Sequence, residues 1–308
     1  MILFWITVFI VSLAILVKGA DWLLVSSEKI GLKIGLSPFV VGVTIVAFGT
    51  SLPELISSFV AVSQGLSSFV VANAVGSNVA NILLVIGLAT LVSKRLQVTK
   101  DLIDLDLPLL AISTSIFLLV AWDGSINFFE SLFLLATYII YLGFALIYKD
   151  DHSTKVKVPD ITTKDLIMLI IGIVSLALGA KYLISAVQQL ATIFDIAPGV
   201  IAITAVAIGT SLPEILVSVK AAARRQSEVA LGNVFGSNIF NVLVVVGLPG
   251  IFGDLTIDSQ TLMIGLPVLL MSTLLFIISG ISRRVHVQEG ALFILLYVIF
   301  IAKLFGLF

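Results

Sequence analysis

Long apolar stretches alternate with short polar ones along the entire 308-residue chain. A helix that spans a bilayer needs about 20 consecutive, mostly apolar residues. On this basis the pattern predicts ten spanning helices, at residues 2–17, 38–62, 68–92, 103–121, 128–148, 164–182, 198–222, 228–252, 261–280 and 288–307. The first of these, an apolar run without a basic leader, is expected to be a retained helix and not a signal peptide. The chain is therefore expected to be an all-α polytopic membrane protein.

Composition supports this interpretation and excludes several kinds of chemistry. Hydrophobic residues make up 59% of the chain and charged residues only 11%, whereas soluble domains carry about 25% charged residues. The mean hydropathy is +1.22. There is no cysteine, which excludes disulfides, thiolate catalysis and zinc–cysteine sites. Short loops leave no room for a soluble catalytic domain.

The distribution of basic residues predicts the orientation. Of the 17 Lys and Arg residues, 15 fall between helices 1 and 2, 3 and 4, 5 and 6, 7 and 8, or 9 and 10, or at the ends of these helices on the same side. These are Lys18, Lys29, Lys33, Lys94, Arg95, Lys100, Lys149, Lys155, Lys157, Lys164, Lys220, Arg224, Arg225, Arg283 and Arg284. Lys181 and Lys303 remain on the other side. Because Lys and Arg concentrate in cytoplasmic loops, we expect a cell-membrane protein with both termini outside and the 149–163 segment in the cytoplasm.

The chain repeats itself at an offset of 160 residues. Residues 38–54 (PFVVGVTIVAFGTSLPE) match 198–214 (PGVIAITAVAIGTSLPE) at 11 of 17 positions, and 73–81 (NAVGSNVAN) matches 233–241 (NVFGSNIFN). Each copy holds five predicted helices, an odd number, so the two copies must lie in opposite orientations. The prediction is ten transmembrane helices arranged as two inverted five-helix repeats: 1–148, a cytoplasmic linker 149–163, and 164–308.

The first repeated motif places oxygen atoms on one face of a helix. Ala47, Thr50, Ser51 and Glu54 are three, four and seven residues apart, which brings them to a single face. Pro53 lacks an N–H group, leaving the Gly49 carbonyl without its usual partner and predicting a kink. The second copy repeats this stripe as Ala207, Thr210, Ser211 and Glu214.

The second repeated motif adds hydroxyl and amide groups. Asn73, Ser77 and Asn81 recur every four residues beside Asn78, and the second copy has Asn233, Ser237 and Asn241 beside Asn238. Gly76 and Gly236 permit close helix contact. Oxygen ligands without His or Cys suit hard cations such as Ca²⁺ and Na⁺. Packing and a site role are equally open for Asn73 and Asn233, whereas a site role is favoured for Ser77, Ser237, Asn81 and Asn241.

The cost of burying charge favours a cation site. An acidic residue at the centre of a spanning helix costs about 2.5–3.5 kcal/mol, and no Lys or Arg lies at the depth of Glu54 and Glu214. Two carboxylates neutralise one Ca²⁺ or two Na⁺, so the ions would compete. The alternatives are protonated carboxyl groups bonded between helices, and Ser and Asn that only pack helices together. Asp21 has Lys181 as its repeat partner and is expected to have an interfacial role.

At GTSLPE and GSNxxN the sequence resembles the cation/calcium exchanger superfamily, and in particular its compact prokaryotic sodium/calcium exchangers, over the whole chain. The resemblance implies exchange of several Na⁺, commonly three, for one Ca²⁺ by alternating access, with the first and sixth helices sliding against the rest. It implies Glu54, Glu214 and the backbone oxygens of Thr50 and Thr210 as calcium ligands. Sodium would use these together with Ala47, Ala207, Ser51, Ser211, Ser77 and Ser237, and Asn81 and Asn241 would line the centre.

Several alternatives are weighed against this function. Some relatives carry an aspartate at one of the positions of Asn81 and Asn241; two asparagines argue against potassium co-transport. A proton-coupled calcium or cation antiporter remains the alternative, although that branch usually carries a Glu-containing second motif, which is absent here. A channel would need a continuous pore. No Ser–Lys, Asp–Asp or His–Glu–His set lies within the predicted helices, so no enzyme and no cofactor are expected. The expected partners are Ca²⁺, Na⁺ and the lipid bilayer, without nucleic acid, and the chain is expected to be a monomer.

Overall fold

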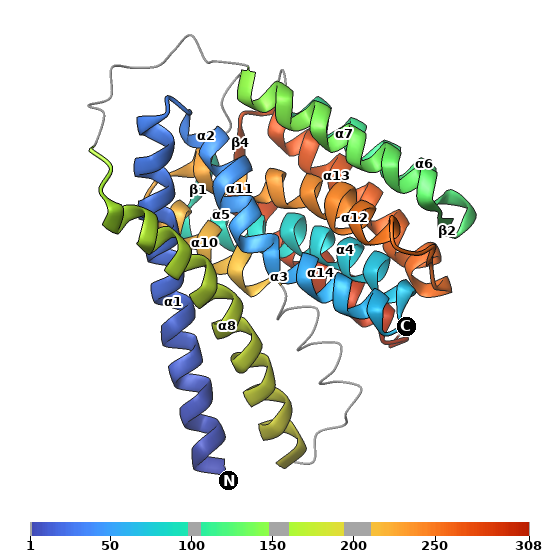
Figure 1. The fold of residues 1–308 in the computed structure, drawn as a ribbon, viewed down its shortest axis with the longest axis horizontal. Coiled ribbons are helices and arrows are strands. Elements are labelled where there is room, and N and C mark those ends of the chain that lie inside the picture. Colours follow the sequence, from blue (N-terminus) through green and yellow to red (C-terminus); the bar gives the residue numbers. More distant parts are fainter. Residues whose placement is uncertain (1, 98–105, 148–159, 194–210, 308) are drawn as a thin grey trace.

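The computed structural model describes residues 2–97, 106–147, 160–193 and 211–307 (Figure 1). Within these ranges the chain is helical apart from two short two-stranded ribbons. Eight helical stretches are long and apolar enough to cross a membrane, and Leu107–Asp123 is a shorter apolar one. The predicted helix 198–222 is described only from Ser211 onward. The expected all-helical membrane fold is confirmed.

The elements follow the predicted order, and several spans are built from a π-helix joined to an α-helix. The helices are α1 (Ile2–Lys33), α2 (Pro38–Val41), η1 (Gly42–Val46), α3 (Ala47–Ser63), α4 (Ser67–Ala80), η2 (Asn81–Val85), α5 (Ile86–Ser93), α6 (Leu107–Val120), η4 (Ala121–Asp123), α7 (Phe128–Ile147), α8 (Thr163–Ile193), α10 (Leu212–Ala223), α11 (Ser227–Phe240), η5 (Asn241–Val245), α12 (Gly247–Gly250), η6 (Thr261–Gly265), α13 (Leu266–Ile281) and α14 (Val287–Leu304). The strands are β1 (Arg95–Gln97), β2 (Ser125–Ile126), β3 (Leu255–Thr256) and β4 (Arg284–His286).

The two ribbons show the inverted repeat directly. Strand β1 pairs with β4, and β2 pairs with β3, both antiparallel. At the 160-residue offset β1 corresponds to β3 and β2 corresponds to β4. The β1–β4 ribbon and the β2–β3 ribbon are therefore repeat partners of each other. The ribbons lie at opposite ends of the spanning helices, with β1 and β4 toward the upper left of Figure 1 and β2 at the right. Such an exchange of ends is what an inverted duplication produces.

Helices α1 and α8 are longer than predicted. The expected ends at residues 17 and 182 are wrong, because α1 continues to Lys33 and α8 to Ile193. The polar residues that suggested a loop are paired: Lys29 Nζ lies 2.8 Å from Asp165 Oδ1. Because its charge is paired, Lys29 can lie within the helix instead of in a solvated loop. Lys18, Lys29 and Lys33 accordingly all lie on α1.

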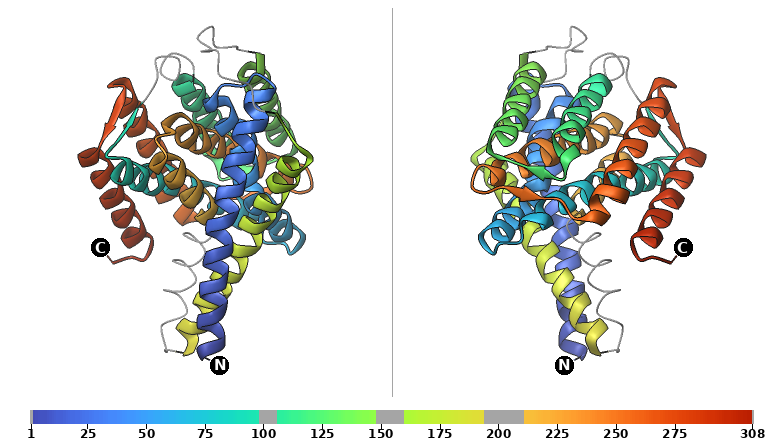
Figure 2. Two further views of the ribbon diagram at one scale, coloured as in Figure 1. Left: turned by 90° about the vertical axis from the view of Figure 1, so that its left-hand side faces the viewer. Right: turned by 90° about the vertical axis from the view of Figure 1, so that its right-hand side faces the viewer.

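Helices α1 and α8 form an antiparallel pair that crosses the remaining bundle obliquely and extends beyond it (Figures 1 and 2). Gly19 and Gly179, which are repeat partners, bring the two backbones close. A Cβ atom on Gly19 would lie 2.8 Å from Ser175 Cβ, and one on Gly179 would lie 2.8 Å from Leu16 Cγ. Small residues at such positions allow close helix packing in membranes. The two long helices therefore form one tightly packed unit.

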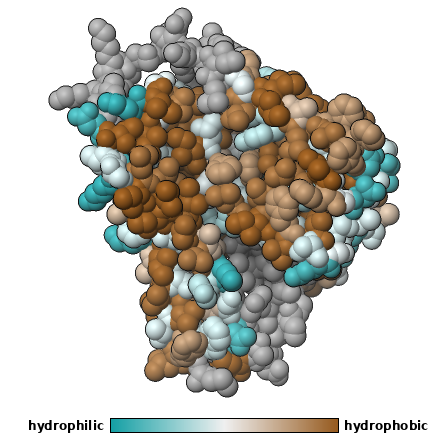
Figure 3. All heavy atoms as spheres, viewed as in Figure 1, coloured by the Kyte–Doolittle hydropathy of each residue, from teal (hydrophilic) through white to brown (hydrophobic). Residues whose placement is uncertain are grey.

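The outer surface suits a bilayer. Hydrophobic side chains cover most of the face seen in Figure 3, while hydrophilic ones gather toward its margins. Leu119, Phe133 and Ile140 are 77%, 66% and 72% exposed. Exposed apolar side chains of this size are stable in lipid and unfavourable in water. The molecule is therefore a multi-pass membrane protein.

Helix α11 forms the centre of the bundle. Every residue from Val229 to Phe240 is buried. A Cβ on Gly236 would collide with the Val43 carbonyl oxygen, and one on Gly232 would lie 2.5 Å from that of Phe39. Helix α11 of the second repeat therefore packs backbone to backbone against α2 and η1 of the first. This contact brings the two copies of the sequence motifs together.

Candidate functional site

Glu54 and Glu214 lie where the two repeats meet. Glu54 is on α3 and is fully buried, and Glu214 is on α10 and only 1% exposed. Ser51, one turn before Glu54 on α3, contacts the Glu214 carboxylate directly. No described Lys, Arg or His makes an ion pair with either, since the recorded pairs all involve Asp21, Asp160 or Asp165. The structure thus buries two acids at the junction of α3 and α10, without a basic partner among the described residues.

Hydroxyl groups of the first repeat connect with polar groups of the second. Ser51 Oγ donates to Glu214 Oε1 over 2.9 Å and lies 3.0 Å from Ser237 Oγ. Thr50 Oγ1 lies 3.1 Å from Asn233 Oδ1 and 3.4 Å from Ser237 Oγ. The stripe on α3 therefore faces α10 and α11, and its hydroxyls form a bridge between the repeats.

A second set of contacts surrounds the pseudo-two-fold axis. Asn78 Nδ2 donates to the Asn238 carbonyl over 2.9 Å, and Asn241 Nδ2 donates to Asn78 Oδ1 over 3.1 Å. Asn78 and Asn238 are repeat partners, and a residue can contact its own repeat partner only near the symmetry axis. The sequence indicated these asparagines merely as neighbours of the motif. Their contact shows that the motifs meet at the axis.

Several oxygen atoms in this region have no hydrogen-bond donor within the described part of the chain. They include Glu54 Oε1 and Oε2, Glu214 Oε2, Ser211 Oγ, Asn81 Oδ1, Asn238 Oδ1 and Asn241 Oδ1. A buried polar atom without a partner is costly. Carboxylate, hydroxyl and amide oxygens together are the ligand set that Ca²⁺ and Na⁺ prefer. The donor set of the site thus fits a hard cation.

The helices are irregular beside the predicted ligands. The π-helices η2 and η5 begin at Asn81 and Asn241, and η1 ends immediately before Ala47. Helix α3 continues through Pro53, so the irregular turn precedes the proline. Single π-helical turns are often found at functional sites. The sequence pattern predicted an interrupted helix but not this form of interruption.

The remaining predicted residues fall into two groups. Ala47, Ser77 and Ser237 are buried on α3, α4 and α11, and Ser211 immediately precedes the first residue of α10. Ala207 and Thr210 lie outside the described residues. The first-repeat half of the predicted site is therefore described completely and the second-repeat half from Ser211 onward.

Two serines of the site region were missed by the sequence analysis. Ser218 lies one helical turn after Glu214, and its Oγ accepts a hydrogen bond of 2.9 Å from Asn233 Nδ2. Its repeat partner, Ser58, is equally buried, but its Oγ has no partner among the described residues. The signal was present in the sequence: both copies have serine four residues after the glutamate that they share.

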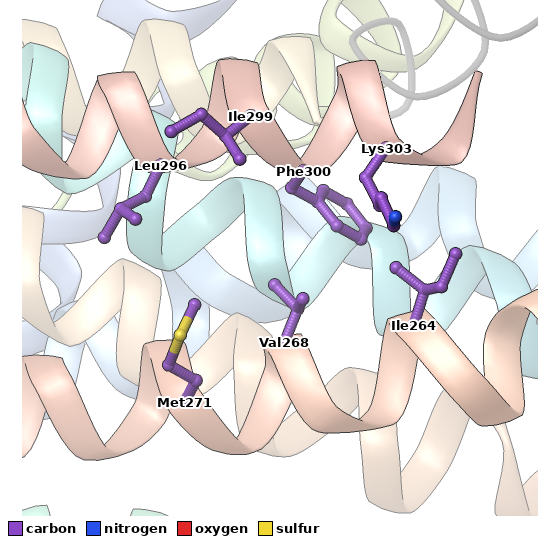
Figure 4. Close-up of a pocket in the computed structure, with 7 residues that line it drawn as sticks. All are labelled: Ile264, Val268, Met271, Leu296, Ile299, Phe300 and Lys303. Carbon is purple, nitrogen blue, oxygen red and sulfur yellow. The ribbon is translucent and has the colours of Figure 1, made fainter. Parts of the chain in front are cut away.

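The described residues outside this region contain no second pair of buried acids. No three His, Cys, Asp or Glu side chains gather within it in a way that could hold a metal. A cavity of about 250 Å³ lies between α13 and α14 (Figure 4). Its lining is apolar except for Lys303 at one end. Without acceptor oxygens this cavity cannot bind a cation.

Comparison with known proteins agrees with this geometry. The family profile described as "Sodium/calcium exchanger protein" matches residues 4–147 and 164–306, which is nearly the entire chain. The chain belongs to the sodium/calcium exchanger family. As a member of this family it is a transporter and not an enzyme.

Relatives of the sodium/calcium exchanger family match from end to end. The sodium/calcium exchanger MaX1 of Methanosarcina acetivorans is 31% identical, over 97% of each chain. The putative antiporter CaxA of Alkalimonas amylolytica is also 31% identical, over 95% of this chain and 96% of its own length. The solved sodium–calcium exchanger NCX_Mj, soaked with Na⁺ and Ca²⁺, superposes with a TM-score of 0.87 at 31% identity, covering 98% of this chain and 99% of its own.

The unequal bonding of Ser58 and Ser218 leads to a prediction. We expect Ser218→Ala to lower the thermal stability of the purified protein by about 1–3 kcal/mol, because Asn233 Nδ2 would lose its buried acceptor. Ser58→Ala removes a hydroxyl without a described partner and serves as the matched control. The measurement is a melting curve of both variants in the same detergent. Equal melting temperatures for the two variants would contradict the assigned hydrogen bond.

Proposed function

We propose that this member of the sodium/calcium exchanger family is an antiporter that exchanges Na⁺ for Ca²⁺ by alternating access. The observation that carries the proposal is the pair Glu54 and Glu214, buried together among oxygen atoms that lack donors. Relatives such as MaX1 and NCX_Mj are named as sodium/calcium exchangers, which supports the proposal.

The proposed ligands follow from the contacts around the two carboxylates. Ca²⁺ would take Glu54, Glu214 and the backbone oxygens of Thr50 and Thr210. Ser51 Oγ, which lies between Glu214 and Ser237, would turn from hydrogen-bond donor to ligand when Na⁺ binds. The complete proposed set for sodium adds Ser51, Ser211, Ser77, Ser237 and the carbonyls of Ala47 and Ala207, with Asn81 and Asn241 lining the centre.

Coupling follows from the cost of the bare carboxylates. Without a bound cation the two acids would cost together about 5–7 kcal/mol within the membrane. Either ion removes this cost, and because both use the same carboxylates they cannot bind together at full occupancy. The protein can therefore change its facing state readily when loaded with Ca²⁺ or Na⁺ and only rarely when empty. A transporter with this property exchanges ions and does not leak them.

The proposal includes an arrangement in the membrane. The repeats 1–148 and 164–308 form the two halves, and the 149–163 linker is cytoplasmic with both termini outside. The pairing of β1 with β4 and of β2 with β3 supports the assignment of their loops to two opposite faces. A single chain supplies both carboxylates, so a monomer is sufficient.

The counter-ion is tested with the full-length protein in proteoliposomes. We expect uptake of radiolabelled Ca²⁺ to be driven by an outward Na⁺ gradient, because Na⁺ competes for the same carboxylates, and not by a K⁺ or H⁺ gradient. Empty liposomes with the same gradients are the control. Uptake driven by a proton gradient alone would instead establish the proton-coupled alternative.

The two carboxylates are tested by neutral substitution. Glu54→Gln and Glu214→Gln are each expected to reduce Ca²⁺ uptake at least ~100-fold, since a single remaining carboxylate cannot balance a divalent ion. Glu130→Gln is the matched control, because this partly exposed glutamate accepts a hydrogen bond from the Asn127 backbone and glutamine can do the same. We expect all three variants to elute as monodisperse peaks in size-exclusion chromatography, which would show that they fold. Wild-type uptake by either buried-site variant would refute the site.

We also propose a stoichiometry of three Na⁺ per Ca²⁺, which has an electrical consequence. Each cycle would move one net positive charge, so we expect Ca²⁺ uptake to vary with an imposed membrane potential. The measurement clamps the potential with valinomycin and K⁺ and follows Ca²⁺ at several voltages. An exchange of two Na⁺ per Ca²⁺ would move no net charge and would show no voltage dependence.

A further inference from the structure

A cluster of three charged side chains joins α1 to α10 and the residue that follows it. Asp21 Oδ2 lies 2.9 Å from Lys220 Nζ, and Asp21 Oδ1 lies 2.6 Å from Arg224 Nη2. The Asp21 side chain is only 30% exposed, so water screens these pairs incompletely. Asp21 is the one acidic group of the cluster and accepts from both bases. Removing it would therefore break both contacts at once.

Two further polar contacts lie along the same side of α1. Lys220 Nζ also donates to the Val17 carbonyl, and Gln226 Nε2 donates to Glu28 Oε2 over 2.8 Å. All the partners belong to the C-terminal end of α10 and the turn that leads to α11. The distribution of basic residues predicts that this end faces the cytoplasm. The contacts thus fasten α1 to the bundle at the predicted cytoplasmic end.

The internal repeat shows what the corresponding contacts would be at the opposite end. At the 160-residue offset Asp21 corresponds to Lys181, Lys220 to Val60, and Arg224 to Gln64. The second contact is lost too, since Glu28 corresponds to Gln188 and Gln226 to Leu66. A mirror-image arrangement would therefore set Lys181 against Val60 and Gln64, where no ion pair can form. The cluster is a one-sided feature in an otherwise symmetric frame.

In a transporter built from inverted repeats, the two facing states are related by exchanging the conformations of the repeats. The ion pairs between α1 and the end of α10 belong to the state described here, and their repeat-related counterparts, at Lys181 of α8 and at Val60 and Gln64, belong to the other state. We propose that Asp21, Lys220 and Arg224 form a one-sided latch, which holds the cytoplasmic side closed in the state described here and opens in the other. The latch, which rests on the proposed function, would set the balance between the two facing states.

The construction of the α1–α8 pair supports this proposal. The glycine contacts of Gly19 and Gly179 and the ion pair between Lys29 and Asp165 bind the two long helices into one unit. A force on α1 therefore acts on α8 as well. None of the latch residues is a proposed ion ligand, so the latch can change the populations of the states without changing the chemistry of ion binding.

The test uses the full-length chain, whose lack of cysteine allows spin labels to be placed at will. Labels on introduced cysteines at Val25 of α1 and at Leu66, between α3 and α4, report the position of α1; both sites are exposed, at 42% and 55%. We expect Asp21→Asn to shift the ratio of the two distance populations about 2- to 30-fold, the range for two partly exposed ion pairs. The Ca²⁺ concentration that gives half-maximal uptake should fall at the cytoplasmic face and rise at the outer face. The reason is that the apparent affinity at each face scales with the population of the state that is open to that face.

Three control variants separate a latch from a merely structural contact. Lys181→Gln, at the repeat partner of Asp21, should leave both ratios unchanged. Reversing all three charges, with Asp21→Lys, Lys220→Asp and Arg224→Asp, should restore the wild-type ratios. Building the mirror-image cluster into the wild-type chain, with Lys181→Asp, Val60→Lys and Gln64→Arg, should offset the native latch by stabilising the opposite state. The ratio should then move in the same direction as in Asp21→Asn.

The outcomes distinguish the latch from the function beneath it. If Asp21→Asn still exchanges Na⁺ for Ca²⁺ with unchanged distances and unchanged half-saturating Ca²⁺ at both faces, the latch is refuted and the proposed function stands. If the wild-type chain shows no exchange under any gradient, the proposed function fails, while the distance measurement still tests the latch. Should Asp21→Asn not fold, the double variant Lys220→Gln with Arg224→Gln breaks the same two ion pairs, and the same shift in the distance populations is expected from it.

Discussion

The burial of two carboxylates at the meeting plane of two helix repeats is the constraint on which the rest of this structure depends. Glu54 and Glu214 are enclosed by the described residues around them, and charge in such surroundings is unstable without a counter-charge. The described chain supplies none from Lys or Arg; it supplies oxygen atoms. Hydroxyls on α3, amides on η2 and η5, and the carboxylates themselves form a shell of oxygen atoms that suits a cation. In the proposed antiporter, selectivity, coupling and exchange would all derive from that shell.

Inverted duplication is an economical way to build such a shell. One motif contributes the Glu54 carboxylate and the hydroxyls of Thr50 and Ser51 from one helix, and its copy contributes the Glu214 carboxylate and the Ser211 hydroxyl from the other repeat. The copies can meet because α11 lies against η1 without intervening side chains, at Gly232 and Gly236. The ribbons β1–β4 and β2–β3 then connect loops of different repeats at each end. Neither half contains both carboxylates, so the proposed site exists only where the two halves are packed together.

Much of this was accessible from the sequence, and what escaped it has a physical reason. The matched motifs identified Glu54, Ser51 and Ser237 because repetition at a fixed offset does not depend on packing. The ends of α1 and α8 were misjudged because Asp21 and Lys29 resembled loop residues, and only tertiary contacts reveal that they are ion-paired within a helix. The π-helices at Asn81 and Asn241 also escaped, since a π-helical turn leaves no hydrophobic period of its own. Ser218 escaped because a serine one turn beyond the motif is ordinary in a spanning helix, and only its contact with Asn233 distinguishes it.

The departures from symmetry are as informative as the symmetry itself. If the repeats were identical, the two facing states would have equal free energies and equal apparent affinities at both faces. The ligands are close to identical in the two halves, but the periphery is not, as Asp21 and its repeat partner Lys181 illustrate. A latch of this kind cannot determine the direction of net transport, because the ion gradients alone fix it. It can only raise the apparent affinity at one face while lowering the apparent affinity at the other. Since Ca²⁺ and Na⁺ differ greatly in concentration across a cell membrane, adjusting the affinities face by face, away from the site, leaves the chemistry of the carboxylates untouched.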